Sequence, residues 1–418
     1  MMRLLKVLSC LIFRNFGKLG CSLRPVWCLR FGTVPLAKPS SRNPIVVSPD
    51  APQGPEYWAA LHAIGQAAGL HSLGVAPADA MLRAREQIHD RIDQDLVNDM
   101  KFTFLRPERS TTPTQHLDGA QSIIVGVRSY AIADHPDAVT SSPLARVARY
   151  AWLDHYGHLK DSLSVVAERL RQDGHRAVVF ADDNAMVDRE SAWLAGLGWF
   201  GKNANILLPG HGSFFVIGCV ITTAVLPVAT PIDDGCGACS RCIPACPTGA
   251  IVKEGVIDAN KCLAWLLQKP GIFDREYRVA LHDRIYGCDD CQTVCPPTRR
   301  TVLSESTEQL QSIIEVLNWL SMDDETLNDS CQRWYVHKRD MTWVRRNLLI
   351  VLGNIADPSN PEVVGAIREH VSHPRSELRA HAVWAAARLG LTGLINHEDS
   401  DPMVRDELLN LPTLREGL

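Results

Sequence analysis

Cysteines constrain this chain more than any other feature, because most of its thirteen cysteines lie in the segment 236–295. The segment opens with C-x2-C-x2-C-x3-C-P and closes with C-x2-C-x3-C-P, and one further cysteine lies between the two runs. Thiolates at this spacing bind three irons of one 4Fe–4S cubane, while the last cysteine of a run binds the other cluster. We therefore predict two clusters, the first held by Cys236, Cys239, Cys242 and Cys295 and the second by Cys288, Cys291, Cys262 and Cys246.

Two other uses of cysteine fit this pattern less well. A disulfide framework is typical of small secreted domains, whereas this chain has 418 residues and few cysteines outside the segment. Structural zinc sites are usually built from two C-x2-C pairs, and a run of three followed by C-P is not needed for one ion. Pro247 and Pro296 suit the end of each run, because proline fixes φ and donates no backbone hydrogen bond.

The composition is that of an ordinary globular protein, with 46% hydrophobic and 22% charged residues, and the length predicts two or three domains. Because iron–sulfur ligation needs reduced thiols, we expect a reducing compartment, the cytoplasm. No apolar run is long enough to cross a bilayer, so no membrane association is expected.

The N-terminal segment 1–49 differs from the rest, because it contains eight Lys and Arg residues and no Asp or Glu. This is the composition of a transit peptide, which would place the protein in an organelle. The alternative is a disordered tail, or upstream sequence that is not part of the fold. The rest of the chain is acidic, since the whole has a net charge of −4, so a nucleic-acid partner would need a local basic surface.

The segment 50–228 alternates predicted helices and strands, which indicates an α/β domain ahead of the cysteine segment. Apolar residues at helical spacing predict helices over 55–69, 80–97, most of 148–174 and 188–196. Short runs rich in β-branched residues predict strands over 122–130, 176–181, 205–208 and 214–223. A linker at 226–235, with two prolines, leads into a ferredoxin-type domain over 229–302.

After Pro297 the pattern becomes all-helical. The stretch 344–353 is echoed at 378–387 and weakly at 404–409, which predicts HEAT-like helical repeats over 303–418. The alternative is an unrelated helical bundle, because the period is irregular.

Basic residues recur along this last part of the chain, and successive repeats present equivalent positions on one surface. They are Arg299, Arg300, Lys338, Arg339, Arg345, Arg346, Arg375 and Arg379. One hypothesis is a stripe that binds RNA phosphates. The alternative is a set of solvated helix faces.

Nucleotide-binding motifs are weak or absent. The stretch 196–201 matches G-x-G-x-x-G, but it follows a predicted helix where a dinucleotide site needs a strand, and the chain has no P-loop motif. The loop 102–109 mixes aromatic and basic residues. It is either a solvated connector or, through residues such as Arg106, a contact to an anionic ligand.

Four blocks of the sequence resemble the epoxyqueuosine reductase family. They are D-D-N-A-M-V-D-R-E from Asp182, G-L-G-W-F-G-K-N from Gly196, G-S-F-F from Gly212, and R-I-Y-G-C-D-D-C-Q-T-V-C-P from Arg284. The resemblance extends from about Pro55 to the C-terminus, and it is specific because these blocks occur together.

The resemblance implies an α/β cobalamin-binding domain, then a ferredoxin-like module with two 4Fe–4S clusters, then an all-α tail of HEAT-like repeats. It implies that cobalamin, reduced by the clusters, converts epoxyqueuosine to queuosine at the tRNA wobble position, the final step of queuosine biosynthesis. The implied partners are tRNA carrying epoxyqueuosine and an external low-potential electron donor, and a monomer is expected. The cofactor would supply the reducing chemistry, while the protein supplies a proton.

Residue roles follow from the same resemblance. Asp182 matches the family's proton donor, which needs a raised pKa to act near neutral pH; the adjacent Asp183 leaves the choice between the two open. Gly157 stands where the family has histidine, and no D-x-H-x-x-G motif occurs, so no such histidine is expected to ligate cobalt. The predicted cobalamin contacts are Arg106, Arg189, Trp199, Lys202, Asn203 and Asp289.

Two other functions were weighed against this one. A reductive dehalogenase would share the cobalamin and the clusters, but that class is typically exported behind a twin-arginine signal, which this sequence lacks. A non-enzymatic electron-transfer protein would hold the clusters alone. Corrinoid absorbance of the purified protein would separate an enzyme of this kind from a bare carrier.

Overall fold

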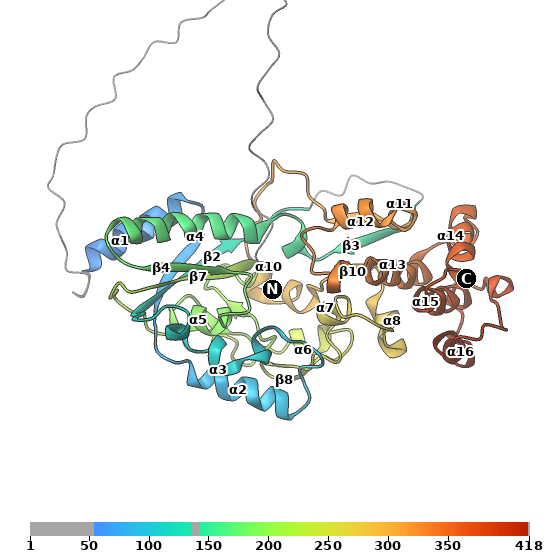
Figure 1. The fold of residues 1–418 in the computed structure, drawn as a ribbon, viewed down its shortest axis with the longest axis horizontal. Helices are drawn as coiled ribbons and strands as arrows, with labels where there is room; N and C mark the ends of the chain where they lie inside the picture. Colours follow the sequence, from blue (N-terminus) through green and yellow to red (C-terminus); the bar gives the residue numbers. More distant parts are fainter. Residues whose placement is uncertain (1–53, 135–141, 417–418) are drawn as a thin grey trace, which may run out of the picture. The chain divides into compact units, whose positions relative to one another are not determined.

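The computed structural model describes residues 54–134 and 142–416 (Figure 1). The predictions for residues 1–49 lie outside the described residues. No helix in the described ranges is both long enough and apolar enough to cross a membrane.

The strands form one four-stranded sheet, one three-stranded sheet and two hairpins within the described residues. They are β1 (Ser72–Pro77), β2 (Ser122–Ser129), β3 (Leu144–Val147), β4 (Ala177–Ala181), β5 (Trp199–Phe200), β6 (Ile206–Leu207), β7 (Phe215–Thr222), β8 (Ile251–Lys253), β9 (Val256–Ile257), β10 (Arg284–Tyr286) and β11 (Ile313–Glu315).

The helices lie before, within and after the cysteine segment. They are α1 (Pro55–Ala67), α2 (Leu82–Asp93), α3 (Pro107–Ser110), α4 (His155–Gln172), α5 (Asp188–Leu194), α6 (Cys242–Ala245), α7 (Leu263–Leu266), α8 (Arg275–Leu281), α9 (Asp290–Thr293), α10 (Pro296–Arg299), α11 (Val316–Ser321), α12 (Asp324–Ser330), α13 (Thr342–Ile355), α14 (Pro361–Val371), α15 (Ser376–Arg388) and α16 (Pro402–Leu409). Short 3-10 helices are η1 (Phe102–Leu105), η2 (Pro113–Gln115), η3 (Arg149–Ala151), η4 (His337–Arg339) and η5 (Thr392–Leu394).

The four-stranded sheet has the order β1-β2-β7-β4, and every neighbouring pair is antiparallel. Helices α1 and α4 lie on one face, and α2 and α5 lie on the other (Figure 1). Side chains of β2 alternate between the faces: Ile124 belongs to the core under α4, whereas Ile123 and Val125 belong to the core over α5. The sheet is therefore buried on both sides, which explains why its strands are nearly continuous apolar runs.

Most predicted elements of this part are confirmed, but the start of one helix differs and several short elements were not predicted. The helix predicted over 148–174 starts only at α4, because Asp154 caps it by accepting a hydrogen bond from the backbone N–H of Gly157 (2.9 Å). Strand β1 was not predicted, because glycine and proline interrupt its apolar run.

A second, three-stranded sheet joins segments that are far apart in the sequence. Strand β3 pairs in parallel with β10 and antiparallel with β11. The all-helical prediction for the chain after Pro297 is therefore wrong at Ile313–Glu315. One hydrophobic core continues from Ala145 through the cysteine segment to Val404 in α16, across the predicted boundaries at 228 and 302.

The predicted basic stripe is wrong, because most of its arginines bind other parts of the protein. Arg346 is fully buried and donates to the carbonyls of Lys269 and Gly271, both at 2.8 Å. The Arg345 guanidinium, also largely buried, pairs with Asp324. A charge pattern in the sequence does not show which faces of these helices point inward.

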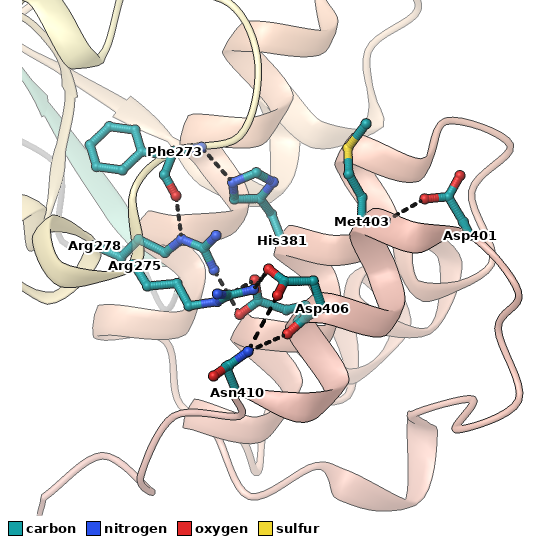
Figure 2. A network of polar contacts seen from close by, with 9 residues as sticks. Phe273, Arg275, Arg278, His381, Asp401, Met403, Asp406 and Asn410 are labelled. Atoms are coloured by element: carbon teal, nitrogen blue, oxygen red, sulfur yellow. Dashed lines mark hydrogen bonds and ion pairs between the residues drawn. The ribbon is translucent and has the colours of Figure 1, made fainter.

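Arg278 of α8 and Glu407 of α16 form a buried ion pair between the cysteine segment and the C-terminal helices (Figure 2). The exposed fractions of their side chains are 0% and 1%, and Arg278 Nη1 lies 2.9 Å from Glu407 Oε1. Arg275 Nε also contacts Glu407 (3.0 Å). The backbone N–H of Phe273 donates to Nε2 of His381 (3.2 Å), so this contact fits a neutral histidine.

We predict that Glu407→Ala lowers the free energy of unfolding by about 3–5 kcal/mol, because it leaves the Arg278 charge buried without its partner. Asp406→Ala is the matched control, since Asp406 pairs with Arg275 but its side chain is 62% exposed, and it should cost at most about 1 kcal/mol. Chemical denaturation of the two variants measures both values. Equal small losses would contradict the assigned role of the buried pair.

Candidate active site and cluster-binding segment

Asp182 follows directly after β4, at the edge of the four-stranded sheet. Its φ is +52°, a left-handed conformation that is uncommon for a residue other than glycine and that often marks functional positions. The residues between Asp182 and Val187 then turn the chain into α5.

The two adjacent aspartates differ in what they bind. Asp183 Oδ1 accepts a hydrogen bond from the backbone N–H of Ala185 (2.8 Å), so it holds the turn. The Asp182 carboxyl has no hydrogen bond or ion pair to any described residue. Although solvent reaches Asp182, desolvation by nearby protein atoms raises its pKa, and the carboxylates of Asp183 and Asp154 raise it further.

A second acid, Asp188, lies at the start of α5 and was not singled out from the sequence. Burial raises its pKa to about 8, and the carboxylates of Asp182 and Asp183 act in the same direction, against the opposing charge of Arg189. Burial also raises the pKa of Tyr156, and the carboxylates of Asp182 and Asp188 raise it further. The site therefore combines two carboxyl groups that resist ionisation with a phenol that stays protonated.

Two further tyrosines connect this site to β3 and β10. The rings of Tyr150 and Tyr286 lie close together, with centroids 6.0 Å apart, and the negative charge of Asp182 contributes to the raised pKa of Tyr286, which burial raises most. The two tyrosines lie in the sequence motifs R-Y-A and R-I-Y-G, but neither motif assigns a role to its tyrosine.

The structure brings the eight cysteines of the segment into two groups. Burial raises the pKa of the Cys242 thiol, and the nearest thiols that add to the shift are those of Cys295, Cys236 and Cys239. These four are the set predicted for the first cluster.

The other group gathers around Cys291. Burial raises the pKa of Cys291 most, and the thiols of Cys288, Cys262 and Cys246 raise it further. The Cys246 Sγ atom also accepts a hydrogen bond from the backbone N–H of Ala250 (3.2 Å). Among the described residues, no three potential ligands converge on one metal ion. A cubane does not require this, because each thiolate binds a different iron.

Helix α9, which carries Cys291, is held against the sheet by buried polar contacts. Asn203 Nδ2 donates to the carbonyl of Cys291 (3.0 Å). Gln292 Oε1 accepts from Ser213 Oγ (2.9 Å) and Tyr130 Oη (3.3 Å), and Gln292 Nε2 donates to Asp289 Oδ1 (3.2 Å). These contacts fix the position of the second group of cysteines.

Asp289 completes this network. Its Oδ2 atom accepts from the backbone N–H of Arg149 (2.6 Å), and burial raises its pKa to about 6 despite that bond. Of the predicted cobalamin contacts, Asn203 and Asp289 therefore lie against the second group of cysteines.

Trp199 and Lys202, from the same predicted set, lie beside the first group. Lys202 Nζ pairs with Glu254 Oε1 (2.7 Å). This hydrogen bond raises the pKa of Lys202 most, and the Cys236 thiolate raises it further. The Trp199 ring lies directly under Gly235, where an added Cβ would come within 2.6 Å of the ring. Any larger residue at 235 would displace the start of the cysteine segment.

The two predicted arginines occupy different places. Arg189 is exposed next to Asp188, and its charge acts on Asp188 and on Cys262 of the second group of cysteines. Arg106 is exposed in the turn after η1. A hollow of about 550 Å³ lies elsewhere, along β1 and the residues after α5, at the far end of that helix from Asp188.

The cysteine segment matches the 4Fe-4S double cluster binding domain over residues 235–298. The chain is also 31% identical over 349 residues to the epoxyqueuosine reductase of Bacillus anthracis, covering 78% of this chain and 87% of that one. The chain belongs to the epoxyqueuosine reductase family. The family's enzyme from Vibrio cholerae is 34% identical over 252 residues, covering 58% of this chain and 67% of that one.

Solved structures of the family share this fold. An epoxyqueuosine reductase with an epoxyqueuosine-modified tRNA-Tyr stem loop matches with a TM-score of 0.78 at 24% identity, covering 85% of this chain and 97% of that one. The enzyme from Streptococcus thermophilus matches with a TM-score of 0.77 at 22% identity, covering 84% and 97%.

We predict that Cys239→Ala removes about one cluster's worth of iron, since it deletes a ligand of the first group only. Cys219→Ala and Cys331→Ala are matched controls, because both thiols are buried away from the segment, in β7 and after α12. Iron and sulfide analysis after anaerobic reconstitution measures the change. Full iron content in Cys239→Ala would overturn the ligand assignment.

Proposed function

We propose that this protein reduces epoxyqueuosine in tRNA to queuosine. The observation that carries the proposal is a carboxyl group, that of Asp182, which has no partner among the described residues and has a raised pKa, together with Arg189, whose charge acts both on the neighbouring Asp188 and on Cys262 of the second group. Family membership names the substrate. A dehalogenase does not account for the family membership, and a bare electron carrier does not account for the Asp182 carboxyl.

The reaction needs two electrons and two protons. Both C–O bonds of the epoxide break, a C=C bond forms, and the oxygen leaves as water. In our proposal electrons from an external low-potential donor pass through the two clusters, and Asp182 donates a proton to the departing oxygen. Asp183 is unsuited to this role, because its carboxylate already accepts the N–H of Ala185.

Residues near Asp182 and near Cys262 fit a bound cobalamin. Arg189 is exposed next to Asp188 and its charge acts on Cys262, and the buried indole N–H of Trp265, which follows closely after Cys262, has no acceptor among the described residues. Amide groups around a corrin ring would provide such acceptors. Arg189, Tyr156 and Trp265 would therefore hold the cofactor, which when bound supplies a strongly nucleophilic, low-potential centre for opening the epoxide.

The residues predicted from sequence as cobalamin contacts take more specific roles in this proposal. Asn203 and Asp289 position the second cluster through α9, while Trp199 and Lys202 support the first. Helices α13 to α16 form the HEAT-like part, and the protein acts as a cytoplasmic monomer.

The test uses protein that is reconstituted anaerobically with iron, sulfide and cobalamin, a chemical reductant and an epoxyqueuosine-containing stem loop. Mass spectrometry of the nucleoside should show loss of one oxygen atom. Protein that holds both clusters and cobalamin but leaves the epoxide intact would contradict the proposal.

We predict that Asp182→Asn lowers turnover by about 10²- to 10⁴-fold while clusters and cobalamin stay bound, because it removes the acid. Asp183→Asn should change turnover only a few-fold, since its role is to hold the turn. Because the protonated form of Asp182 is the active one and its pKa is raised, wild-type turnover should fall as pH rises through that pKa. Equal losses in both variants, or a rate that rises with pH in this range, would exclude Asp182 as the donor.

A further inference from the structure

An exposed aromatic and basic surface lies next to the candidate active site. It consists of two segments, the turn η1 with its flanking residues and the stretch before η4. The edge of the Tyr335 ring meets Phe102, with ring centroids 5.6 Å apart and an interplanar angle of 64°. Tyr335 is 44% exposed and Leu105 is 63% exposed, so both side chains are open to a partner. We call this surface the rim.

Both segments of the rim are anchored to active-site residues. The backbone N–H of Tyr335 donates to the hydroxyl of Tyr286 (2.8 Å), the tyrosine that is electrostatically coupled to Asp182. On the other side, Phe102 packs edge-on against Trp265, with centroids 5.7 Å apart. Trp265 follows closely after Cys262, so this side of the rim lies next to the second group of cysteines.

A strained turn presents a cation at the rim. Lys338 and Arg339 both have φ of +54°, a conformation that costs energy for residues with side chains. Arg339 stabilises the turn by donating to the carbonyl of Trp334 (2.8 Å), whereas Lys338 is exposed and has no partner among the described residues. Lys101 and Arg106, which flank η1, are exposed and unpaired in the same way. These three cations differ from Arg345, Arg346 and Arg379 of the C-terminal helices, whose guanidinium groups bind other groups of the protein.

We propose that the rim binds the single-stranded anticodon loop of the substrate RNA, with a base next to the modified one stacked on Tyr335 and loop phosphates near Lys338, Lys101 and Arg106. This inference rests on the proposed function and adds how the RNA is held. Unstacked loop bases are typically recognised by stacking on aromatic side chains, and phosphates need unpaired cations. The rim provides both and is anchored to Tyr286, on which the charge of Asp182 acts, whereas Arg345 and Arg346 bind Asp324 and buried carbonyls.

The experiment compares variants for binding of a labelled anticodon stem loop at fixed salt. Tyr335→Ala should raise the Kd about 5- to 100-fold, and Tyr335→Phe, which keeps the ring, should stay within about two-fold of wild type. Lys338→Ala should reduce the dependence of log K on log salt by about 0.7. Lys160→Ala is the matched control, because Lys160 is exposed and unpaired on α4, and it should leave the salt dependence unchanged.

The outcomes separate this inference from the proposed function. If wild type reduces the epoxide and Tyr335→Ala binds the stem loop as tightly as wild type, the rim does not carry the RNA. Loss of bound cobalamin with unchanged RNA affinity in Tyr335→Ala would assign the rim to the cofactor and overturn the inference. If wild type binds the stem loop through Tyr335 but never reduces the epoxide, the proposed function fails while the rim assignment stands.

Discussion

The rest of the structure depends on the docking of helix α9 against the antiparallel sheet. This short helix lies between cysteines of both groups, and it has too few residues to be stable by itself. Gln292 and Asn203 fix it through buried hydrogen bonds to Ser213, Tyr130 and the carbonyl of Cys291. Because buried polar groups are costly when unpaired, these contacts define one position for the helix and for the cysteines beside it.

The cost of leaving buried polar groups unpaired also explains how this acidic protein uses its arginines. Arg346 satisfies several backbone carbonyls between the cysteine segment and α13, and Arg278 shares a buried carboxylate with Arg275. Desolvating such charges is expensive, so each is paired within the protein and contributes little to the outer surface. These arginines are therefore not available to a polyanionic partner, whereas the cations of the rim are exposed.

The amount that the sequence could predict differs from part to part. The cysteine groups follow from ligand spacing, which is a local property, and Asp182 follows from a local motif and its position after a strand. The roles of Asn203 and Lys202 did not follow, because the residues they contact, Cys291 and Glu254, lie far along the chain. Strands β3 and β11 were missed for the same reason, since they are short and stabilised by pairing with each other. Arg346 points inward because of the way the helices pack, and the positions of charged residues in the sequence do not show this.

The central claim is that the second cluster and the acid Asp182 share one cofactor site. Electron paramagnetic resonance of protein loaded with Co(II) cobalamin tests it, because a reduced cluster nearby speeds the relaxation of the cobalt signal. The account predicts faster cobalt relaxation when the clusters are reduced, loss of this effect in Cys262→Ala, and its retention in Cys239→Ala. A bound cobalamin whose signal is insensitive to cluster reduction, or one that depends on Cys239 and not on Cys262, would contradict the account.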